Sequence, residues 1–423
     1  MKISEIRTIL AGNELDEKLR YITCSKDIAG QKERYDALLK KALSAFGDQE
    51  AYIITAPGRT EVCGNHTDHQ LGKVLAASVN MDISAVAVKC SDEVEYISEG
   101  FKVAPVKIDD LNIHPEEKFT SEALIRGTLA AFASRGYKTG GFRALSDSEV
   151  LPGSGISSSA AFEVLIGTIL SDLYNDGKID PIEIAKIGQY AENAYFMKPC
   201  GLLDQMACSL GGFITIDFKD RENPKVEKIH FDFANSGLNV VLVNTKGDHA
   251  DLSDEYGLMP KEMKEVAHAL GKEVLSQCTM EEFMQNLKKI REQCSDRAML
   301  RAIHYFNEVE RVDAAVSALK KDDIETFKKT IIASGYSSYM YLQNVYVPKD
   351  YKTQNLSLAL ALSEQILKGR GAWRVHGGGL AGTIQAFVPH DLLDAYKKTL
   401  CSVYGEDACF VLSIRPVGGY QIV

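Results

Sequence analysis

Apolar residues recur along this chain at two spacings, and the spacing changes from one segment to the next. A recurrence every three or four residues predicts helices within residues 1–48, over 121–135 and over 181–196. Short apolar or alternating runs predict strands, and these runs cover residues 51–55, 81–89, 94–97, 102–108, 141–146, 213–217 and 238–244. The first third of the chain therefore carries a mixed sheet.

The second half has a mostly helical pattern between residues 256 and 367. A strand, a triple-glycine turn at 377–379 and another strand follow within 371–388, and then come a helix at 390–400 and a strand at 409–415. A charged hairpin near residue 230 separates the two parts. We therefore expect an α+β protein whose two domains comprise residues 1–230 and 231–423.

The composition narrows the class of protein. The 423 residues are 45% hydrophobic and 25% charged, and a net charge of −10 argues against a nucleic-acid-binding face. No apolar run is long enough to span a bilayer, and the polar N-terminus lacks a signal-peptide core. Nine scattered cysteines without a CxxC pair indicate reduced thiols. We expect a cytoplasmic monomer with a small-molecule substrate and no nucleic-acid or membrane partner.

The stretch VLPGSGISSSAAFEV, residues 150–164, places a glycine-rich loop directly before a helix. Unpaired backbone N–H groups and the positive end of the helix dipole favour an anion there, and phosphate is the commonest one. The serine hydroxyls can bond phosphate oxygens or reach a magnesium ion. The alternative is an ordinary capped helix after a glycine turn.

A second stretch, residues 56–79, crowds polar and charged side chains between two apolar strands. Its hydrogen-bonding side chains are Arg59, Glu61, Asn65, His66, Asp68 and His69. So many different donors and acceptors in one loop suit a polyhydroxyl ligand. The alternative is a solvated hairpin.

Two further carboxylates lie in apolar surroundings. Glu192 falls at the edge of the apolar face of the helix predicted for 181–196, where a carboxylate is costly unless it is paired or bound to a metal. Asp204 lies among apolar and small residues beside the other motifs, which makes it a candidate general base. The alternatives are an edge glutamate that reaches solvent and an aspartate that caps a short helix.

Known phosphate-transfer motifs are missing, since the sequence has neither G-x-x-x-x-G-K-[ST] nor the HRD and DFG set of the protein kinases. Several stretches, taken together, instead resemble the GHMP small-molecule kinases. PGSGISSSA resembles their nucleotide loop and GGGLAG their third motif, while GR-x-x-x-x-G-x-H-T-D-x-x-x-G and PCGLLDQ resemble the galactokinase branch. The resemblance spans residues 51–388. It implies a two-domain α+β fold, with an N-terminal mixed sheet-and-helix domain, a C-terminal ferredoxin-like domain and the active site between them.

The same resemblance implies a role for each candidate residue. Asp204 would take the proton from the C1 hydroxyl of the sugar, with Arg59 as the cation beside it, and Ser159 and Glu192 would bind Mg²⁺. The residues that would contact the sugar are Asn65, His66, Asp68, Gly201 and Tyr256. The residues that would bind ATP are Pro152, Gly153, Ser154, Gly155, Ile156, Ser157, Ser158, Ser159 and Ala160.

The implied reaction is the ATP- and Mg²⁺-dependent phosphorylation of α-D-galactose at C1, and it agrees with the residues, because phosphoryl transfer needs positioning and charge neutralisation. Two positions depart from the family, which usually has Glu before the histidine and Tyr after the aspartate. This chain has Asn65 and His69 there. Because Asn65 lacks the negative charge, a 1-kinase for a related sugar such as galacturonate or arabinose is an alternative. A catalytically silent sugar sensor on the same fold is another.

Overall fold

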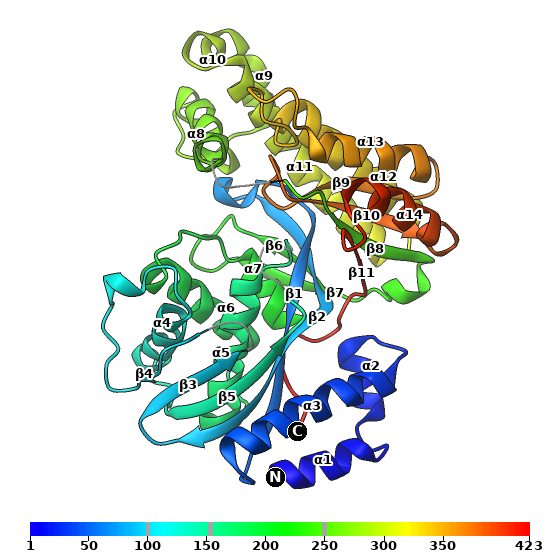
Figure 1. Ribbon diagram of the computed structural model, residues 1–423. Helices are drawn as coiled ribbons and strands as arrows, with labels where there is room; N and C mark the ends of the chain where they lie inside the picture. The colour runs from blue at the N-terminus through cyan, green and yellow to red at the C-terminus, as the bar shows by residue number, and fades with distance from the viewer. Residues whose placement is uncertain (99–101, 151–154, 248–251) are drawn as a thin grey trace.

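The computed structural model describes residues 1–98, 102–150, 155–247 and 252–423, and it contains two β-sheets covered by helices (Figure 1). The predicted α+β class is confirmed. The larger sheet has the strand order β12-β1-β2-β5-β3-β4, with β6 paired to β2 and β7 paired to β6. Its strands are β1 (Tyr52–Cys63), β2 (Lys73–Cys90), β3 (Glu93–Ser98), β4 (Val106–Lys107), β5 (Gly141–Ser148), β6 (Phe213–Asp217), β7 (Lys225–Ile229) and β12 (Tyr420–Gln421).

The long strands β1 and β2 separate two hydrophobic layers, because successive side chains of a strand point to opposite faces. The cross-strand pair Ile53 and Val86 faces one layer, and the next pair, Ile54 and Ala85, faces the other. The first layer contains the N-terminal helices α1 (Ile3–Ala11), α2 (Asp16–Thr23) and α3 (Ile28–Phe46). The opposite layer contains α4 (Ser121–Ser134), α5 (Ser158–Tyr174), α6 (Pro181–Tyr190) and α7 (Leu203–Leu210).

The smaller sheet has the strand order β11-β8-β10-β9, and all its neighbouring strands are antiparallel. Its strands are β8 (Leu238–Asn244), β9 (Ala372–His376), β10 (Thr383–Pro389) and β11 (Cys409–Leu412). The helices of this half are α8 (Ser253–Ala269), α9 (Met280–Gln285), α10 (Leu287–Gln293), α11 (Asp296–Lys320), α12 (Ile324–Ser337), α13 (Asn355–Leu367) and α14 (Leu393–Tyr404). Every residue of β9 is buried, including Arg374 and His376.

The β1–β2 hairpin connects the two halves, since it extends from the larger sheet up to the helices of the second half (Figure 1). Helix α11 packs on both of its strands, and β9 contacts β1. The last strand, β12, returns to the larger sheet and pairs with β1. The predicted domain boundary near residue 230 lies between β7 and β8 and stays a prediction.

The structure corrects two predictions about strands. Residues 56–79, predicted as a polar loop, lie mostly within β1 and β2, so the loop is confined to residues 64–72. Polar side chains within the strands misled the prediction, because they have partners inside the protein; Thr60, for example, is fully buried and bonds His376. The strand predicted at 102–108 is reduced to the two residues of β4 at the sheet edge.

Two chemical features complete the description. All nine cysteines are free thiols, as the spacing of cysteines in the sequence predicts. Within the four described ranges, no helix combines the length and the apolar character that a membrane crossing requires.

Candidate active site

Arg59 and Asp204 form an ion pair with two hydrogen bonds. Arg59 Nε donates to Asp204 Oδ1 at 2.7 Å, and Nη2 donates to Oδ2 at 2.6 Å. Arg59 extends from β1, and Asp204 belongs to the first turn of α7. A bidentate guanidinium fixes the orientation of a carboxylate as well as its position. The structure therefore brings together the two residues predicted as the cation and the base.

The carboxyl group of Asp204 is ionised at neutral pH. Burial raises its pKa, but Arg59 and a hydrogen bond from Ser157 outweigh burial and hold the pKa below its ordinary value. The side chain is 33% exposed, so a ligand can reach it. The N-cap of α7 is Leu202. The alternative that Asp204 is a capping residue is therefore wrong.

The serine loop approaches this pair from the start of α5. Gly155 and Ser157 both have positive φ, 81° and 64°, so the backbone turns sharply before α5 begins at Ser158. The carbonyl oxygen of Gly155 accepts from Arg59 Nη1 at 2.7 Å, and Ser157 Oγ donates to Asp204 Oδ2 at 2.5 Å. The N-terminus of α5, which favours an anion, therefore lies beside the base.

The other residues predicted to bind ATP fall into three groups. Pro152, Gly153 and Ser154 lie outside the described residues. The side chains of Ile156 and Ala160 are buried in the core, so only their backbone groups can serve a ligand. Ser158 and Ser159 are half-buried at the first turn of α5.

Ser159 and Glu192, the predicted metal ligands, are in direct contact. Ser159 Oγ donates to Glu192 Oε1 at 3.0 Å. Glu192 is buried in a π-helical turn, Ala191–Tyr195, that follows α6. Lys198 Nζ donates to the same oxygen at 3.0 Å, and Gln205 Nε2 donates to Oε2 at 2.8 Å. Because Glu192 is buried and fully partnered, the alternative of an edge glutamate that reaches solvent is wrong.

This pair of oxygen donors fits Mg²⁺. Magnesium binds hard oxygen ligands and is usually held by one or two protein side chains, with water and phosphate oxygens completing its shell. Ser159 and Glu192 offer a hydroxyl and a carboxylate beside the anion-favouring end of α5. The part of the chain that the structure describes holds no group of three or more His, Cys, Asp and Glu side chains suited to a metal ion.

A small polar cavity of about 120 Å³ lies beside Asp204. Its lining residues are Glu61, Gly64, Asp68, Val74, Cys200, Gly201, Leu203 and Asp204. A Cβ atom at Gly201 would lie 2.8 Å from Asp68 Oδ2, so glycine lets these two segments close around the cavity. Asp68, Gly201 and Asp204, three residues of the predicted site, therefore share one cavity.

His66 and Tyr256, also predicted to contact the sugar, meet instead at the triple-glycine turn. His66 Nε2 lies 2.9 Å from the carbonyl oxygen of Gly378, and the Tyr256 hydroxyl donates to that of Gly379 at 2.6 Å. Burial raises the pKa of Tyr256 to about 12. Neither side chain lines the cavity beside Asp204. Their contact with a sugar stays a prediction.

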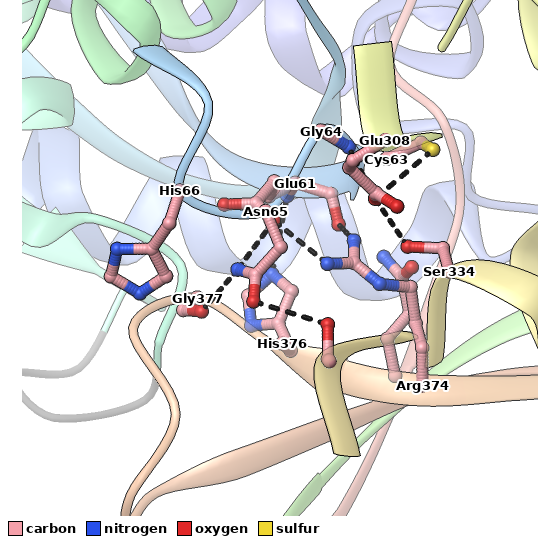
Figure 2. A network of polar contacts seen from close by, with 12 residues as sticks. Glu61, Cys63, Gly64, Asn65, His66, Glu308, Ser334, Arg374, His376 and Gly377 are labelled. Carbon is pink, nitrogen blue, oxygen red and sulfur yellow. Dashed lines mark hydrogen bonds and ion pairs between the residues drawn. The ribbon is translucent and has the colours of Figure 1, made fainter. Parts of the chain in front are cut away.

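Asn65 is fully buried, and both ends of its amide are engaged (Figure 2). Nδ2 donates to Glu61 Oε1 at 3.0 Å and to the Gly377 carbonyl at 2.7 Å. Oδ1 accepts from Asn344 Nδ2 at 2.8 Å and from Ser338 Oγ at 3.4 Å. Because all four hydrogen-bonding positions of the amide are used, a sugar contact from Asn65 requires one of these bonds to open.

His69, the second departure from the family, is uncharged at neutral pH. Burial lowers its pKa well below the ordinary value, and the neighbouring His66 and Lys264 lower it further. Its Nε2 lies 3.3 Å from His66 Nδ1. His69 therefore supplies no cation that could pair with a carboxylate on a sugar.

A larger cavity, of about 580 Å³, adjoins the serine loop at Ser158 and Ser159. Its aromatic lining residues are Tyr96, Phe119, Phe162 and Phe196. Apolar walls with a few polar groups are typical of sites for flat organic ligands. The sequence carries no local motif for this cavity, because its lining is spread over residues 83–196.

Sequence reasoning missed several residues that support the site. Lys198 and Gln205 hold Glu192. Arg374 pairs with Glu61 through Nη2 and Oε1 at 2.9 Å. A signal for Arg374 was available, because an arginine in the middle of an otherwise apolar strand requires a buried partner.

Comparison with known proteins agrees with this geometry. Residues 123–212 match the family described as GHMP kinases N terminal domain, and residues 43–89 match the galactokinase galactose-binding signature. The chain is 31% identical to the galactokinase of Thermotoga petrophila over 355 residues, which are 82% of this chain and 94% of that protein. It is 26% identical to the galactokinase of Clostridium tetani over 373 residues, which are 87% and 92% of the two chains.

Solved structures give the same result. The Lactococcus lactis galactokinase complexed with galactose matches with a TM-score of 0.78 and 25% identity, over 92% of this chain and 99% of that one. The Methanococcus jannaschii mevalonate kinase matches with a TM-score of 0.62 and 15% identity, over 86% and 98%, which shows a common fold. The predicted GHMP kinase fold is therefore confirmed. The chain belongs to the galactokinase family of the GHMP kinases.

Proposed function

We propose that this protein transfers the γ-phosphoryl group of ATP to the C1 hydroxyl of α-D-galactose, giving galactose 1-phosphate and ADP. The observation that carries the proposal is the position of the Arg59–Asp204 pair. Asp204 lines the polar cavity on one side and bonds Ser157 of the serine loop on the other. A sugar hydroxyl in the cavity and a phosphate at the start of α5 would therefore meet at this carboxylate.

Asp204 acts as the general base in this reaction. The C1 hydroxyl loses its proton to an Asp204 oxygen as its own oxygen forms the bond to the γ-phosphorus, and the bond from that phosphorus to the bridging oxygen of ADP breaks. Arg59 keeps the carboxylate oriented, and its positive charge stabilises the developing charge at the reacting oxygen. Ser159 and Glu192 would hold Mg²⁺, which neutralises charge on the phosphates.

We further propose that the nucleoside of ATP occupies the cavity of about 580 Å³ next to the serine loop. Its aromatic side chains suit the adenine ring, and Ser158 and Ser159 lie where the cavity meets the phosphate-binding end of α5. This placement puts the phosphates between the nucleoside and Asp204.

Among the candidate sugars, the charges at the site favour a neutral one. The polar cavity is lined by the carboxylates of Glu61, Asp68 and Asp204, and His69 is uncharged. A galacturonate carboxylate would meet repulsion there, because none of the residues that line the cavity is cationic and Arg59 is already paired with Asp204. We therefore infer that galactose is preferred over galacturonate. The silent-sensor alternative is disfavoured, because Arg59, Asp204, Ser159 and Glu192 all stand in contact with their expected partners.

The test is ATP consumption by the purified protein over a panel of galactose, arabinose, galacturonate and glucose. We expect galactose to give the highest kcat/KM and a product phosphorylated at C1. Binding of galactose without release of ADP would identify a sensor instead. A higher kcat/KM for galacturonate or arabinose would overturn the galactose assignment.

We also infer that the enzyme works in the cytoplasm as a monomer of two domains divided near residue 230. Nine free thiols suit a reducing compartment. The candidate site is built from residues of one chain, so it needs no second copy. Gel filtration with light scattering checks the oligomeric state.

A further inference from the structure

Glu61 belongs to the same face of β1 as Arg59. The two residues are two positions apart in a stretch of β1 that pairs with β2 without a register shift, since Arg59 pairs with Ser78 and Glu61 with Ala76. Side chains at this spacing point the same way and lie about 7 Å apart along the strand. Glu61 also lines the polar cavity together with Asp204. Its carboxylate therefore stands beside the catalytic pair, displaced along the strand.

Two buried residues, Arg374 and Asn65, bind the Glu61 carboxylate (Figure 2). Arg374 donates through Nη2 to Glu61 Oε1 at 2.9 Å and through Nη1 to the Glu61 carbonyl oxygen at 3.2 Å. Asn65 Nδ2 donates to the same Oε1 at 3.0 Å. Arg374 and Asn65 are both fully buried, whereas the Glu61 side chain is 13% exposed. Glu61 is therefore oriented by the protein interior and presented to the cavity.

We propose that Glu61 is a specificity-determining residue for the sugar, which binds a hydroxyl remote from C1 and excludes sugars that carry a carboxylate. The proposal rests on the proposed function, because it takes the C1 hydroxyl to lie at Asp204. In the described structure both bonds to the carboxylate go to Oε1, which leaves Oε2 to accept a hydrogen bond from the sugar.

The charge of the cavity gives the second part of the proposal. Glu61, Asp68 and Asp204 line it, and none of its other lining residues is cationic. The guanidinium groups of Arg59 and Arg374 are already used, since Arg59 pairs with Asp204 and Arg374 with Glu61. An anionic substituent that enters near Glu61 therefore meets like charge without compensation. The same proposal explains why an asparagine stands at position 65, because Asn65 is a partner that orients the Glu61 carboxylate.

The experiment compares kcat and KM for galactose and galacturonate in wild type, Glu61→Gln and Glu61→Asp. We expect Glu61→Gln, which keeps shape but removes charge, to raise the KM for galactose by about tenfold with kcat within about threefold of wild type. We also expect it to raise kcat/KM for galacturonate relative to galactose by at least about tenfold. Glu61→Asp should weaken galactose binding yet keep the discrimination against galacturonate.

Glu308→Gln is the matched control. Glu308 is a fully buried carboxylate of the same network that bonds Gly64 and Ser334 but does not line the cavity. The melting temperature of the Glu308→Gln variant should fall, while the ratio of kcat/KM for the two sugars should stay as in wild type. A Glu61→Gln variant with unchanged galactose KM and an unchanged sugar ratio would overturn the proposal.

The outcomes separate this proposal from the proposed function. If wild type prefers a different neutral sugar, the galactose assignment fails. The role of Glu61 is then judged by the ratio of kcat/KM for that sugar to kcat/KM for the corresponding uronic acid. If wild type prefers a sugar acid, both proposals fail. Circular dichroism and the melting temperature of each variant distinguish loss of binding from loss of fold.

Discussion

At the scale of single residues, the chemistry depends on a carboxylate that remains ionised where it is partly buried. Asp204 keeps its charge because Arg59 binds both of its oxygens and Ser157 donates to one of them. The same contacts orient the carboxylate toward the cavity before any substrate arrives. A base that is already charged and oriented needs little rearrangement in the transition state.

The first prediction concerns this base. Asp204→Asn keeps the size of the side chain but cannot accept a proton, so kcat should fall by about 10²-fold or more while galactose binding stays nearly normal. Steady-state kinetics and calorimetric titration with galactose measure the two quantities. A variant whose kcat lies within a few-fold of wild type would show that Asp204 is not the base.

The second prediction concerns the pair formed by Ser159 and Glu192. Ser159→Ala and Glu192→Gln each remove an oxygen ligand from a hard cation, so each should raise the Mg²⁺ concentration needed for half-maximal activity. Glu183→Gln is the control, because Glu183 lies on α6, directly before the π turn that carries Glu192, but pairs with Arg135 near the surface. If the magnesium titrations of both site variants overlay that of wild type, Ser159 and Glu192 are not the metal ligands.

At the scale of elements, periodicity predicted the amphipathic helices well and the long strands poorly. The helix predicted for 390–400 is found as α14, because one of its faces packs on the smaller sheet while the other is exposed. In β1 and β2 several polar residues lie inside the protein and pair with side chains from distant parts of the chain, as Glu61 does with Arg374. A local pattern cannot reveal such partners, so this part of the site was read as a loop.

The π-helical turn after α6 is another element that the sequence pattern could not show. The helix was predicted to run to residue 196, and the extra residue of a π turn leaves the apolar pattern almost unchanged. The position of the π turn matters, because this turn places Glu192 in contact with Ser159. The turn packs against α4 at Gly127, where an added Cβ would lie 2.8 Å from the Ala191 Cα and 3.0 Å from the Tyr195 Cβ.

The third prediction follows from this contact. Gly127→Ala should destabilise the protein by about 1–3 kcal/mol through overpacking, and it should raise the Mg²⁺ requirement because the π turn must shift. Thermal unfolding and the magnesium titration measure the two effects. Gly257→Ala in α8 is the control, since nothing lies within 4 Å of its added Cβ. A Gly127→Ala variant as stable as the control would mean that α4 does not set the position of the turn.

At the scale of the whole molecule, buried ion pairs join segments that are far apart in sequence. Asp82 on β2 is fully buried between Arg34 of α3 and Arg415 near the C-terminus. Glu308 of α11, which pairs with Arg311 one turn along the same helix, also accepts a hydrogen bond from the backbone N–H of Gly64 at the hairpin tip. The fold class and the family motifs were predictable, because they depend on local pattern and order. The long-range contacts were not, because no local signal links residues as far apart as Asp82 and Arg415 or Gly64 and Glu308.

The last prediction is that Glu308 makes the stability of the protein depend on pH. Burial would raise the pKa of this carboxyl, but the neighbouring His304, the guanidinium groups of Arg374 and Arg311 and a hydrogen bond from Ser334 outweigh burial and lower it to about 2 from an ordinary value of 4.5. A carboxyl whose pKa is lower in the folded state stabilises the fold above its unfolded pKa. That stability is lost as pH falls toward the folded pKa.

The contribution of Glu308 should therefore be complete above about pH 5 and should decline between pH 4.5 and about 2. Glu308→Gln removes the charge, so it should lower the unfolding free energy by on the order of a few kcal/mol at pH 7. The difference from wild type should shrink as the pH is lowered through this window. Denaturant unfolding of both proteins at several pH values, over the range where wild type is folded, gives that difference directly. If the difference in unfolding free energy stays constant from pH 7 down into this window, lowering the pH destabilises the two proteins equally. Glu308 would then not be the group whose protonation weakens the fold.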